Sequence, residues 1–296
     1  MPRSTRLFTR VFPARRRHIR TGVSLHSHTL HSRERFAGVP WTPPLSPSQA
    51  IALESGQIRE LGMDALVSLT DHDNIDAALE LRATMEGRCT PVSVEWSVPW
   101  RGAEMHLGVH NMPPARARER MASLAGFTAV PRECELDGLL DWLHDDPSTL
   151  IVWNHPLWDE NAMGAECFGG VAKEFLRRYR PWIHALEVNG LRPWKENHLV
   201  MRWAEAESLP AISGGDRHGC EPNAFLNLTR AASFAEFIDE VREDKRSRVL
   251  VMPQYRHSFL HRLWTNWPSR YNRIHEAAIL SLPTAGGRLR TGTENA

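Results

Sequence analysis

Two histidines stand two positions apart near the start of the chain, in the run Gly22-Val23-Ser24-Leu25-His26-Ser27-His28. If this apolar-flanked run is a strand, its period of two places His26 and His28 on the same face. Two imidazoles that point the same way at a strand end are the beginning of a metal site. Such a site needs further ligands from elsewhere in the chain.

Further histidine and carboxylate side chains occur where other short apolar runs end. The strands expected over 65–70, 91–94, 104–110, 150–154 and 209–213 end near, or contain, His72, Glu95, His106, His155 and Asp216. A lone histidine on a strand is more often a packed or surface residue, but six strand ends in succession form a pattern. Nitrogen and oxygen donors without thiolate suit zinc, manganese or iron and allow more than one ion.

The elements that position these residues alternate between strand and helix. Helices are expected over 49–61, 75–85 and 234–243, the stretch 113–146 is helical in character, and the proline-rich residues 36–47 are expected to be a loop. Further strands are expected over 185–189 and 249–251. Alternating strands and helices predict a parallel sheet, and this many strands favour a barrel over an open sheet. In such a barrel the carboxyl ends of the strands converge at one mouth, where the chemistry takes place.

Composition sets few other limits on function. The 296 residues include 36 Lys and Arg and 35 Asp and Glu, so bulk charge gives no argument for nucleic acid or membrane partners. No apolar run approaches the roughly 20 residues that span a bilayer. The four cysteines form no CxxC pair, which favours a reducing, cytoplasmic location.

The chain is expected to be one domain with two appendages. Residues 1–21 form a basic arm that is Arg-rich and acid-poor, as transit peptides are; a surface arm or a start codon upstream of the true one is the simpler interpretation. Residues 22–283 form the domain, with 113–146 as a helical insertion and 255–283 as a C-terminal helical segment. Residues 284–296 are expected to be a flexible tail.

The chain resembles the PHP (polymerase and histidinol phosphatase) superfamily of metal-dependent phosphoesterases. The resemblance rests on six motifs in the family's order: Leu25-His26-Ser27-His28-Thr29, Leu69-Thr70-Asp71-His72-Asp73, Val94-Glu95, Glu104-Met105-His106-Leu107-Gly108, Asn154-His155-Pro156 and Gly215-Asp216-Arg217-His218. Together, the HxH, TDHD and DxH motifs are fairly specific for this family.

This resemblance implies an α/β fold, a distorted (β/α)7 TIM-like barrel with the metal site at the carboxyl ends of the strands. It implies two or three divalent ions (manganese, zinc or iron) and a catalytic role for Glu95 and Asp216. By analogy, the first ion is bound by His26, His28 and Asp216. Glu95 bridges two ions, His106 and His155 complete the second, and His72 and His218 bind the third.

Two positions remain open within the resemblance. Many family members carry an acidic residue in an Asp-Gly pair shortly after the HxH motif, whereas this chain reads Ser32-Arg33-Glu34-Arg35. Glu34 is the expected replacement ligand, His31 is the alternative, and loss of the third ion is a further possibility. His106 is preferred over His110 because it precedes Leu-Gly at the family's spacing from Glu95, although His110 lies on the same strand face.

The expected function is hydrolysis of a phosphate ester, a small phosphomonoester or a nucleotide, by a metal-bridging hydroxide. Paired cations lower the pKa of a shared water to near 7 and neutralise phosphate oxygens. Arg192 and Arg217 are candidate substrate contacts because a guanidinium presents a fork of donors; each is otherwise a surface charge, and strand alternation also lets Arg217 point outward.

Two alternative functions remain. The first is amidohydrolase-like cleavage of C–N or C–O bonds, although those enzymes typically bridge their metals with a carboxylated lysine where this chain offers Glu95. The second is a catalytically degenerate PHP binding module. The sequence identifies neither the substrate nor the oligomeric state.

Overall fold

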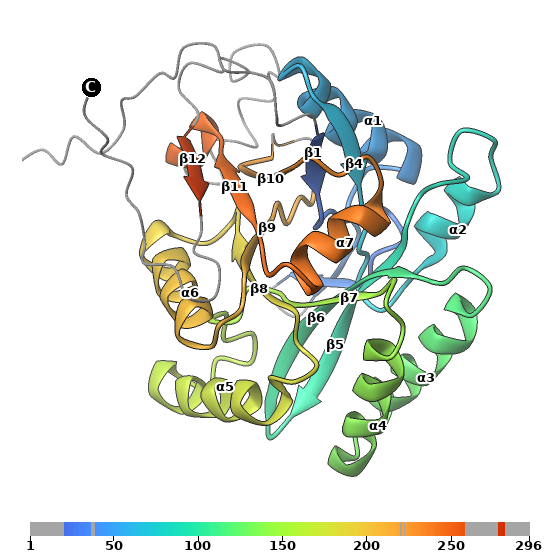
Figure 1. Ribbon diagram of the computed structural model, residues 1–296. Coiled ribbons are helices and arrows are strands. Elements are labelled where there is room, and N and C mark those ends of the chain that lie inside the picture. The colour runs from blue at the N-terminus through green and yellow to red at the C-terminus, as the bar shows by residue number, and fades with distance from the viewer. Residues whose placement is uncertain (1–20, 37–38, 220, 222, 258–277, 282–296) are drawn as a thin grey trace, which may run out of the picture.

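The computed structural model describes residues 21–36, 39–219, 221, 223–257 and 278–281. In these ranges the strands lie at the centre and the helices lie around them (Figure 1). Nearly all of the expected basic arm, the whole of the expected tail and residues 258–277 lie outside the described residues.

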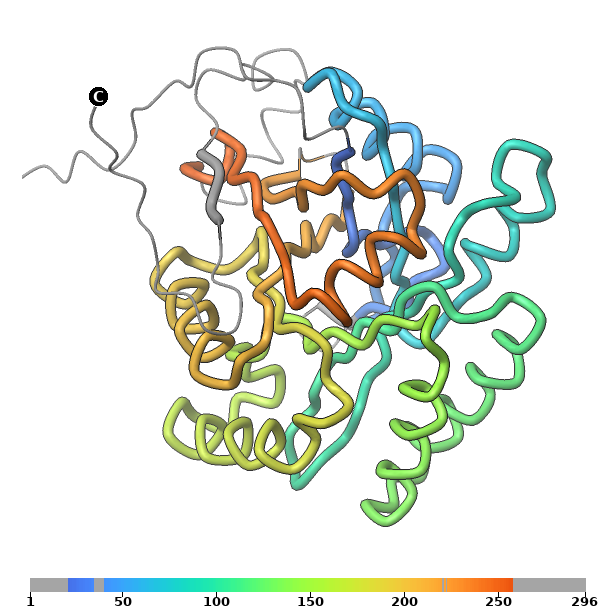
Figure 2. The backbone as a smooth tube through the Cα atoms, viewed as in Figure 1, coloured from blue at the N-terminus to red at the C-terminus, as the bar shows by residue number. Residues whose placement is uncertain are grey.

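One sheet joins the beginning of the chain to its later part. Its strand order is β12-β11-β10-β1-β4. β1 (Thr21–Ser24) runs parallel to β4 (Asp64–Val67) and antiparallel to β10 (Phe225–Thr229). β11 (Arg248–Val251) and β12 (Ala278–Ser281) extend the sheet by antiparallel pairing. In Figure 2 the dark blue β1 accordingly lies beside the orange end of the trace.

A second sheet contains the middle of the chain, in the order β5-β6-β7-β8-β9. β5 (Val92–Trp100) and β6 (Ala103–Met112) form an antiparallel hairpin, and β7 (Leu150–Trp153) pairs antiparallel with β6. β8 (Ala185–Asn189) and β9 (Ala211–Gly214) continue in parallel.

The expected (β/α)7 barrel is therefore wrong, because the described strands form two mixed sheets that do not close into a barrel. The connection between β5 and β6 explains part of this error. Parallel neighbours need a crossover of about a dozen residues or more, and only Arg101 and Gly102 separate these two strands. Single parallel bridges, Ser27 with Arg217 and His72 with Glu95, connect the two sheets.

Helices cover the outside of both sheets. Five of them fall where the sequence predicts helices, whereas α5 and α6 occupy stretches for which no helix was specified. The α-helices of the described residues are α1 (Pro47–Glu60), α2 (Asp76–Arg82), α3 (Ala117–Ala129), α4 (Glu133–His144), α5 (Ala165–Tyr179), α6 (Trp194–Ala206) and α7 (Phe234–Arg242).

Two segments differ from their sequence prediction. The range 36–47, expected to be a loop, begins at the last residue of β2 (Glu34–Phe36) and includes β3 (Val39–Trp41), which pairs antiparallel with β2. Pro40 is compatible with this pairing because an edge strand does not need every backbone N–H. Within the segment predicted to be helical at the C-terminal end, the described residues form a 3-10 turn, Pro253–Arg256, and the strand β12, whose short apolar run pairs with β11.

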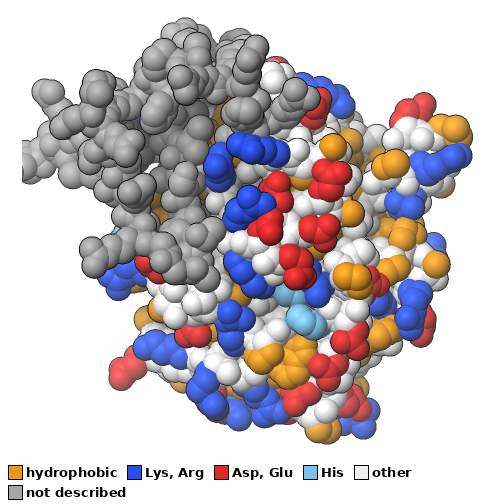
Figure 3. All heavy atoms as spheres, viewed as in Figure 1, with side chains coloured by type: hydrophobic (Ala, Val, Ile, Leu, Met, Phe, Trp, Pro, Cys, Tyr) orange, Lys and Arg blue, Asp and Glu red, His pale blue; other side chains and the backbone are white. Residues whose placement is uncertain are grey.

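The largest apolar core lies between the second sheet and helices α3 to α6. Trp96, Trp153, Phe175 and Tyr179 are fully buried there, and their rings contact one another or neighbouring aromatic rings at 4.8–5.6 Å. On the face that carries α7, acidic and basic side chains are interspersed (Figure 3). Among the described helices, none combines the length and the apolar character needed to cross a membrane.

Candidate metal centre

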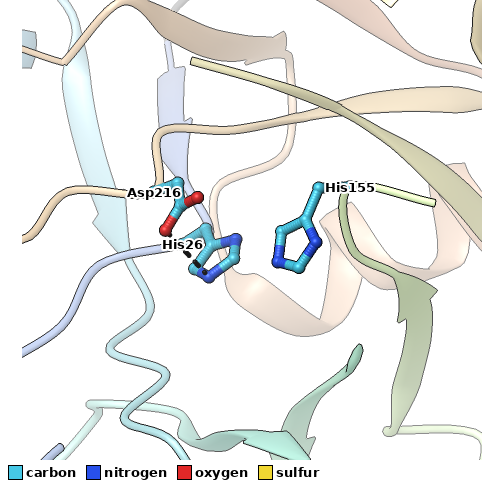
Figure 4. A group of neighbouring side chains, drawn as sticks. All are labelled: His26, His155 and Asp216. Carbon is cyan, nitrogen blue, oxygen red and sulfur yellow. Dashed lines mark ion pairs between the residues drawn. The ribbon is translucent and has the colours of Figure 1, made fainter. Parts of the chain in front are cut away.

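The structure brings the side chains of all nine predicted metal ligands together in one cluster, to which the strands β2, β5 and β6 contribute Glu34, Glu95 and His106. Their donor atoms form five overlapping groups, each within 4.8 Å. Figure 4 shows one group, in which His26, His155 and Asp216 point toward one another from three separate strand ends. The other groups are His26, His28 and Glu95; His28, Asp216 and His218; His28, Glu34 and His72; and His72, Glu95 and His106.

Glu95, at 0% exposure, is the central carboxylate of this cluster. It lies within the buried run of β5, and both of its oxygens face imidazoles. Oε2 lies 2.8 Å from His26 Nε2, 3.2 Å from His72 Nε2 and 3.3 Å from His28 Nε2, and Oε1 lies 3.1 Å from His155 Nε2 and 3.6 Å from His106 Nδ1.

Asp216 supplies the second buried carboxylate. Its Oδ1 lies 3.4 Å from Nε2 of His28, 3.4 Å from Nδ1 of His218 and 3.6 Å from Nε2 of His26. Asp216 adopts a φ of 53° and His155 a φ of 28°. Positive φ values are uncommon in residues other than glycine and are found disproportionately at functional sites.

Glu34, rather than His31, reaches the cluster. Its Oε1 lies 3.3 Å from His28 Nδ1 and 3.5 Å from His218 Nε2, and its Oε2 lies 3.6 Å from His72 Nε2. His31 instead pairs at the surface with Glu80, at 2.9 Å. The geometry thus favours Glu34 of the two residues that the sequence left open.

The structure also distinguishes His106 from His110. His106 lies 3.6 Å from Glu95 Oε1 and 3.1 Å from Glu104 Oε1. His110 is buried further along β6, where its Nδ1 lies 3.0 Å from the hydroxyl of Ser68. His110 belongs to none of the five groups.

The carboxylates and imidazoles strongly shift each other's pKa values. Burial disfavours the charged form of Glu95 and raises the pKa of its carboxyl. The electrostatic attraction of His26 and His72 is larger and holds this pKa well below its usual range. Burial likewise opposes protonation of His106 and His218, but neighbouring carboxylates raise the pKa of each imidazole to about 9. The Glu95 carboxylate is thus ionised at neutral pH.

Three buried polar residues of the site were missed by the sequence reasoning. Glu187 Oε1 accepts a hydrogen bond from His26 Nδ1 at 2.9 Å, and Oε2 accepts one from the backbone N–H of His155 at 3.0 Å. Asn189 donates to Glu187 and to Asp216, and Asn154 donates to Glu95. The sequence feature that could have indicated them is a polar residue inside an otherwise apolar strand, as in Ala185-Leu186-Glu187-Val188-Asn189.

The two arginines proposed as substrate contacts lie in different surroundings. Arg192 is held by Glu196 through Nε at 2.6 Å and NH2 at 2.8 Å, and its guanidinium lies 4.1 Å from the ring centroid of Trp158. Trp158 in turn lies beside His155. The guanidinium of Arg217 is buried against Glu54 of α1.

The donor set fits divalent ions. Nε2 of His28 is buried with no hydrogen-bond partner among the described residues, yet it lies within 3.4 Å of oxygens of both Glu95 and Asp216. A buried nitrogen without a hydrogen bond is costly, and a cation shared with these oxygens would satisfy it. Six imidazoles and three carboxylates suit zinc, manganese or iron.

Comparison with known proteins gives only a likeness of fold. No family model matches the chain, and no curated protein matches it. Among solved structures, PsfC from Pseudomonas syringae PB-5123 is 17% identical with a TM-score of 0.55, covering 83% of this chain and 97% of PsfC. Two further similar structures have TM-scores below 0.5.

These two are an amidohydrolase from Chromobacterium violaceum with bound sulfate and no metal, and a protein assigned as a metal-dependent phosphoesterase from Bifidobacterium adolescentis. They are 19% and 14% identical, with TM-scores of 0.45 and 0.40, and each alignment covers 67% of this chain and 87% of the other. The resemblance to the PHP superfamily stays a prediction from the motifs.

Proposed function

We propose that the chain is a metal-dependent hydrolase that cleaves a phosphate ester, a small phosphomonoester or a nucleotide, at the cluster around Glu95. The observation that supports this function is the convergence of nine histidine, glutamate and aspartate side chains into five overlapping three-donor groups. Divalent ions bound there would supply Lewis-acid stabilisation of the phosphate oxygens and a hydroxide at neutral pH.

The residues of the chain would then hold and orient the reacting parts. Glu95 and Asp216 are the proposed catalytic carboxylates, because burial keeps them from water while the surrounding imidazoles keep them ionised. Glu187 fixes the ring of His26 through its Nδ1, so that its Nε2 faces Glu95. Arg192 is the proposed substrate contact, since Glu196 and Trp158 fix its plane and Trp158 lies beside His155.

Replacement of His26 and Glu95 by alanine tests this function. The double variant should lose bound metal, as measured by elemental analysis, together with hydrolysis of a panel of phosphomonoesters and nucleotides. His198→Ala is a matched control, because His198 lies on α6 against Trp194 and belongs to none of the five groups. Full activity in the double variant would contradict the proposal.

The same substrate panel separates the alternatives. Cleavage of amides or lactones without cleavage of phosphate esters would identify an amidohydrolase-like enzyme. Wild-type protein without tightly held metal would instead indicate a binding module. Against the first alternative, the residue that two of the donor groups share beside His26 and His72 is Glu95 rather than a lysine that could be carboxylated.

A further inference from the structure

The segment after β9 carries Asp216 and His218, and the residue between them is fixed from behind by helix α1. Nε of Arg217 lies 2.7 Å from Glu54 Oε1, and its NH2 donates to Gln57 Oε1 at 2.8 Å. Glu54 is 0% exposed and Arg217 is 3% exposed. A buried ion pair is costly to desolvate and contributes little net stability by itself, so a function at the adjacent cluster would explain its presence.

The backbone of Arg217 connects both ligand-bearing segments. Its carbonyl accepts a hydrogen bond from the N–H of His28 at 2.8 Å, and its N–H donates to the carbonyl of His26 at 3.3 Å. Asp216 and His218 therefore lie next to His26 and His28 through the backbone, while the side chain of Arg217 anchors the pair of segments to α1.

A second anchor from α1 holds the far end of the same segment. The side chain of Asn223 donates to Glu54 Oε2 and to Ser24 Oγ, both at 3.1 Å. Gln57 accepts from the N–H of Asn223 and donates to its carbonyl, both at 2.9 Å. Residues 217 and 223 are thus tied to the same two side chains of α1.

We propose that Glu54 and Arg217 are positioning residues that hold Asp216 and His218 at the distance from His28 that ion binding requires. This inference rests on the proposed metal-dependent function. Asp216 has a positive φ, which is unfavourable for a non-glycine residue and persists only with support from its surroundings. Arg217 supplies that support because its guanidinium engages Glu54 and Gln57 together, which a lysine ammonium does not do in the same geometry.

The double variant Glu54→Met/Arg217→Met tests the positioning role. Exchanging both partners for apolar side chains leaves no unpaired buried charge, and Gln57 and Asn223 keep their mutual hydrogen bonds. The metal-free variant should therefore unfold at nearly the wild-type temperature. Its dissociation constant for Mn²⁺, measured by chelator competition, should rise about 10- to 100-fold, as is typical when partners of metal ligands are lost.

Two further variants make the outcome decisive. Arg217→Lys retains the charge and should weaken Mn²⁺ binding less than the double variant does. Arg120→Met/Asp146→Asn removes another ion pair, between the buried Arg120 and the partly exposed Asp146 at 3.1 Å; neither residue belongs to the five groups, so Mn²⁺ affinity should be unchanged.

Unchanged affinity in both the Glu54/Arg217 double variant and Arg217→Lys would overturn the inference while leaving the metal site intact. Should the double variant not fold, Arg217→Lys alone decides, and wild-type affinity in it overturns the inference. A wild-type protein that binds no Mn²⁺ or Zn²⁺ would instead overturn the proposed function and this inference with it.

Discussion

At the scale of single residues, His26 has both ring nitrogens engaged by carboxylates. Nε2 lies 2.8 Å from Glu95 and Nδ1 lies 2.9 Å from Glu187. A carboxylate at one nitrogen fixes the ring orientation and directs the other nitrogen toward an ion. Glu187 thus belongs to the proposed metal centre through its contact with His26, a proposed ligand.

Replacing Glu187 by glutamine should weaken metal binding more than it weakens folding. The amide keeps the size of the side chain but removes the negative charge beside His26, and loss of such partners costs about 10- to 100-fold in metal affinity. Chelator competition measures the effect. Glu205→Gln, on the exposed face of α6, is the control; equal affinities in the two variants would contradict this role.

Metal affinity should rise with pH between 7 and 9. Without metal, His106 and His218 have pKa values of about 9 and are protonated at pH 7. An ion must displace these protons, because only the neutral imidazole is a ligand. Zinc affinity should therefore increase over this range by about tenfold per pH unit for each proton displaced. A flat profile over this range would exclude these two residues as ligands.

Residue-level prediction from the sequence succeeded where strand periodicity applied. His26 and His28 share a site because alternate positions of an extended run face the same way. The same alternation turns Arg217 away from Asp216 and His218, but its partner Glu54 lies on a distant helix that no spacing rule connects to it. The sequence does not reveal the role of Glu187, because that role depends on its contact with His26, which is far away in the chain.

At the scale of elements, the start of β2 supplies the carboxylate of the donor group that contains His28 and His72. Glu34 begins β2 and reaches His28, His72 and His218, whereas His31 precedes the strand and pairs with Glu80. The prolines of residues 36–47 predict a loop just after Glu34, and they do not reveal that β3 pairs antiparallel with β2.

Glu34→Ala should remove one bound ion per chain, because it takes the carboxylate from the group that contains His28 and His72. His31→Ala should retain the wild-type number, since its partner lies at the surface. Elemental analysis after dialysis gives the ratio of ions to chains. Equal ratios in the wild type and both variants would show that Glu34 holds no ion.

At the scale of the whole molecule, the sequence predicted the strands better than their arrangement. Short apolar runs identified most strands. The carboxyl ends of β1, β4, β7 and β9 lead to the cluster, whereas Glu95 and His106 lie within the antiparallel strands β5 and β6. The barrel prediction failed because nothing local in the runs of β10 and β11 reveals that they run antiparallel to their neighbours. Whether two strands pair parallel or antiparallel depends on how segments far apart in the sequence pack together. Only the short connection between β5 and β6 reveals a direction of pairing from the sequence itself.

Removal of metal should lower the thermal stability of the entire chain, because the ligands come from both sheets. An ion at 100 times its dissociation constant stabilises the folded state by about 2.7 kcal/mol, which corresponds to roughly 5–10 °C in the unfolding temperature. Thermal unfolding with and without a chelator, followed by addition of Mn²⁺ or Zn²⁺, measures this shift. Identical unfolding temperatures would mean that metal does not connect the sheets energetically.

The pairing of β1 with β10 has a consequence for how the protein is made. Thr21 lies opposite Thr229, and the predicted ligands extend from His26 to His218, across most of the described chain. A ribosome adds about 5–20 residues per second, so His218 is synthesised on the order of 10–40 s after His26. An ion met in that interval finds only part of its donors. The proposed ions therefore find their complete set of donors only at the end of synthesis, once β10 has paired with β1.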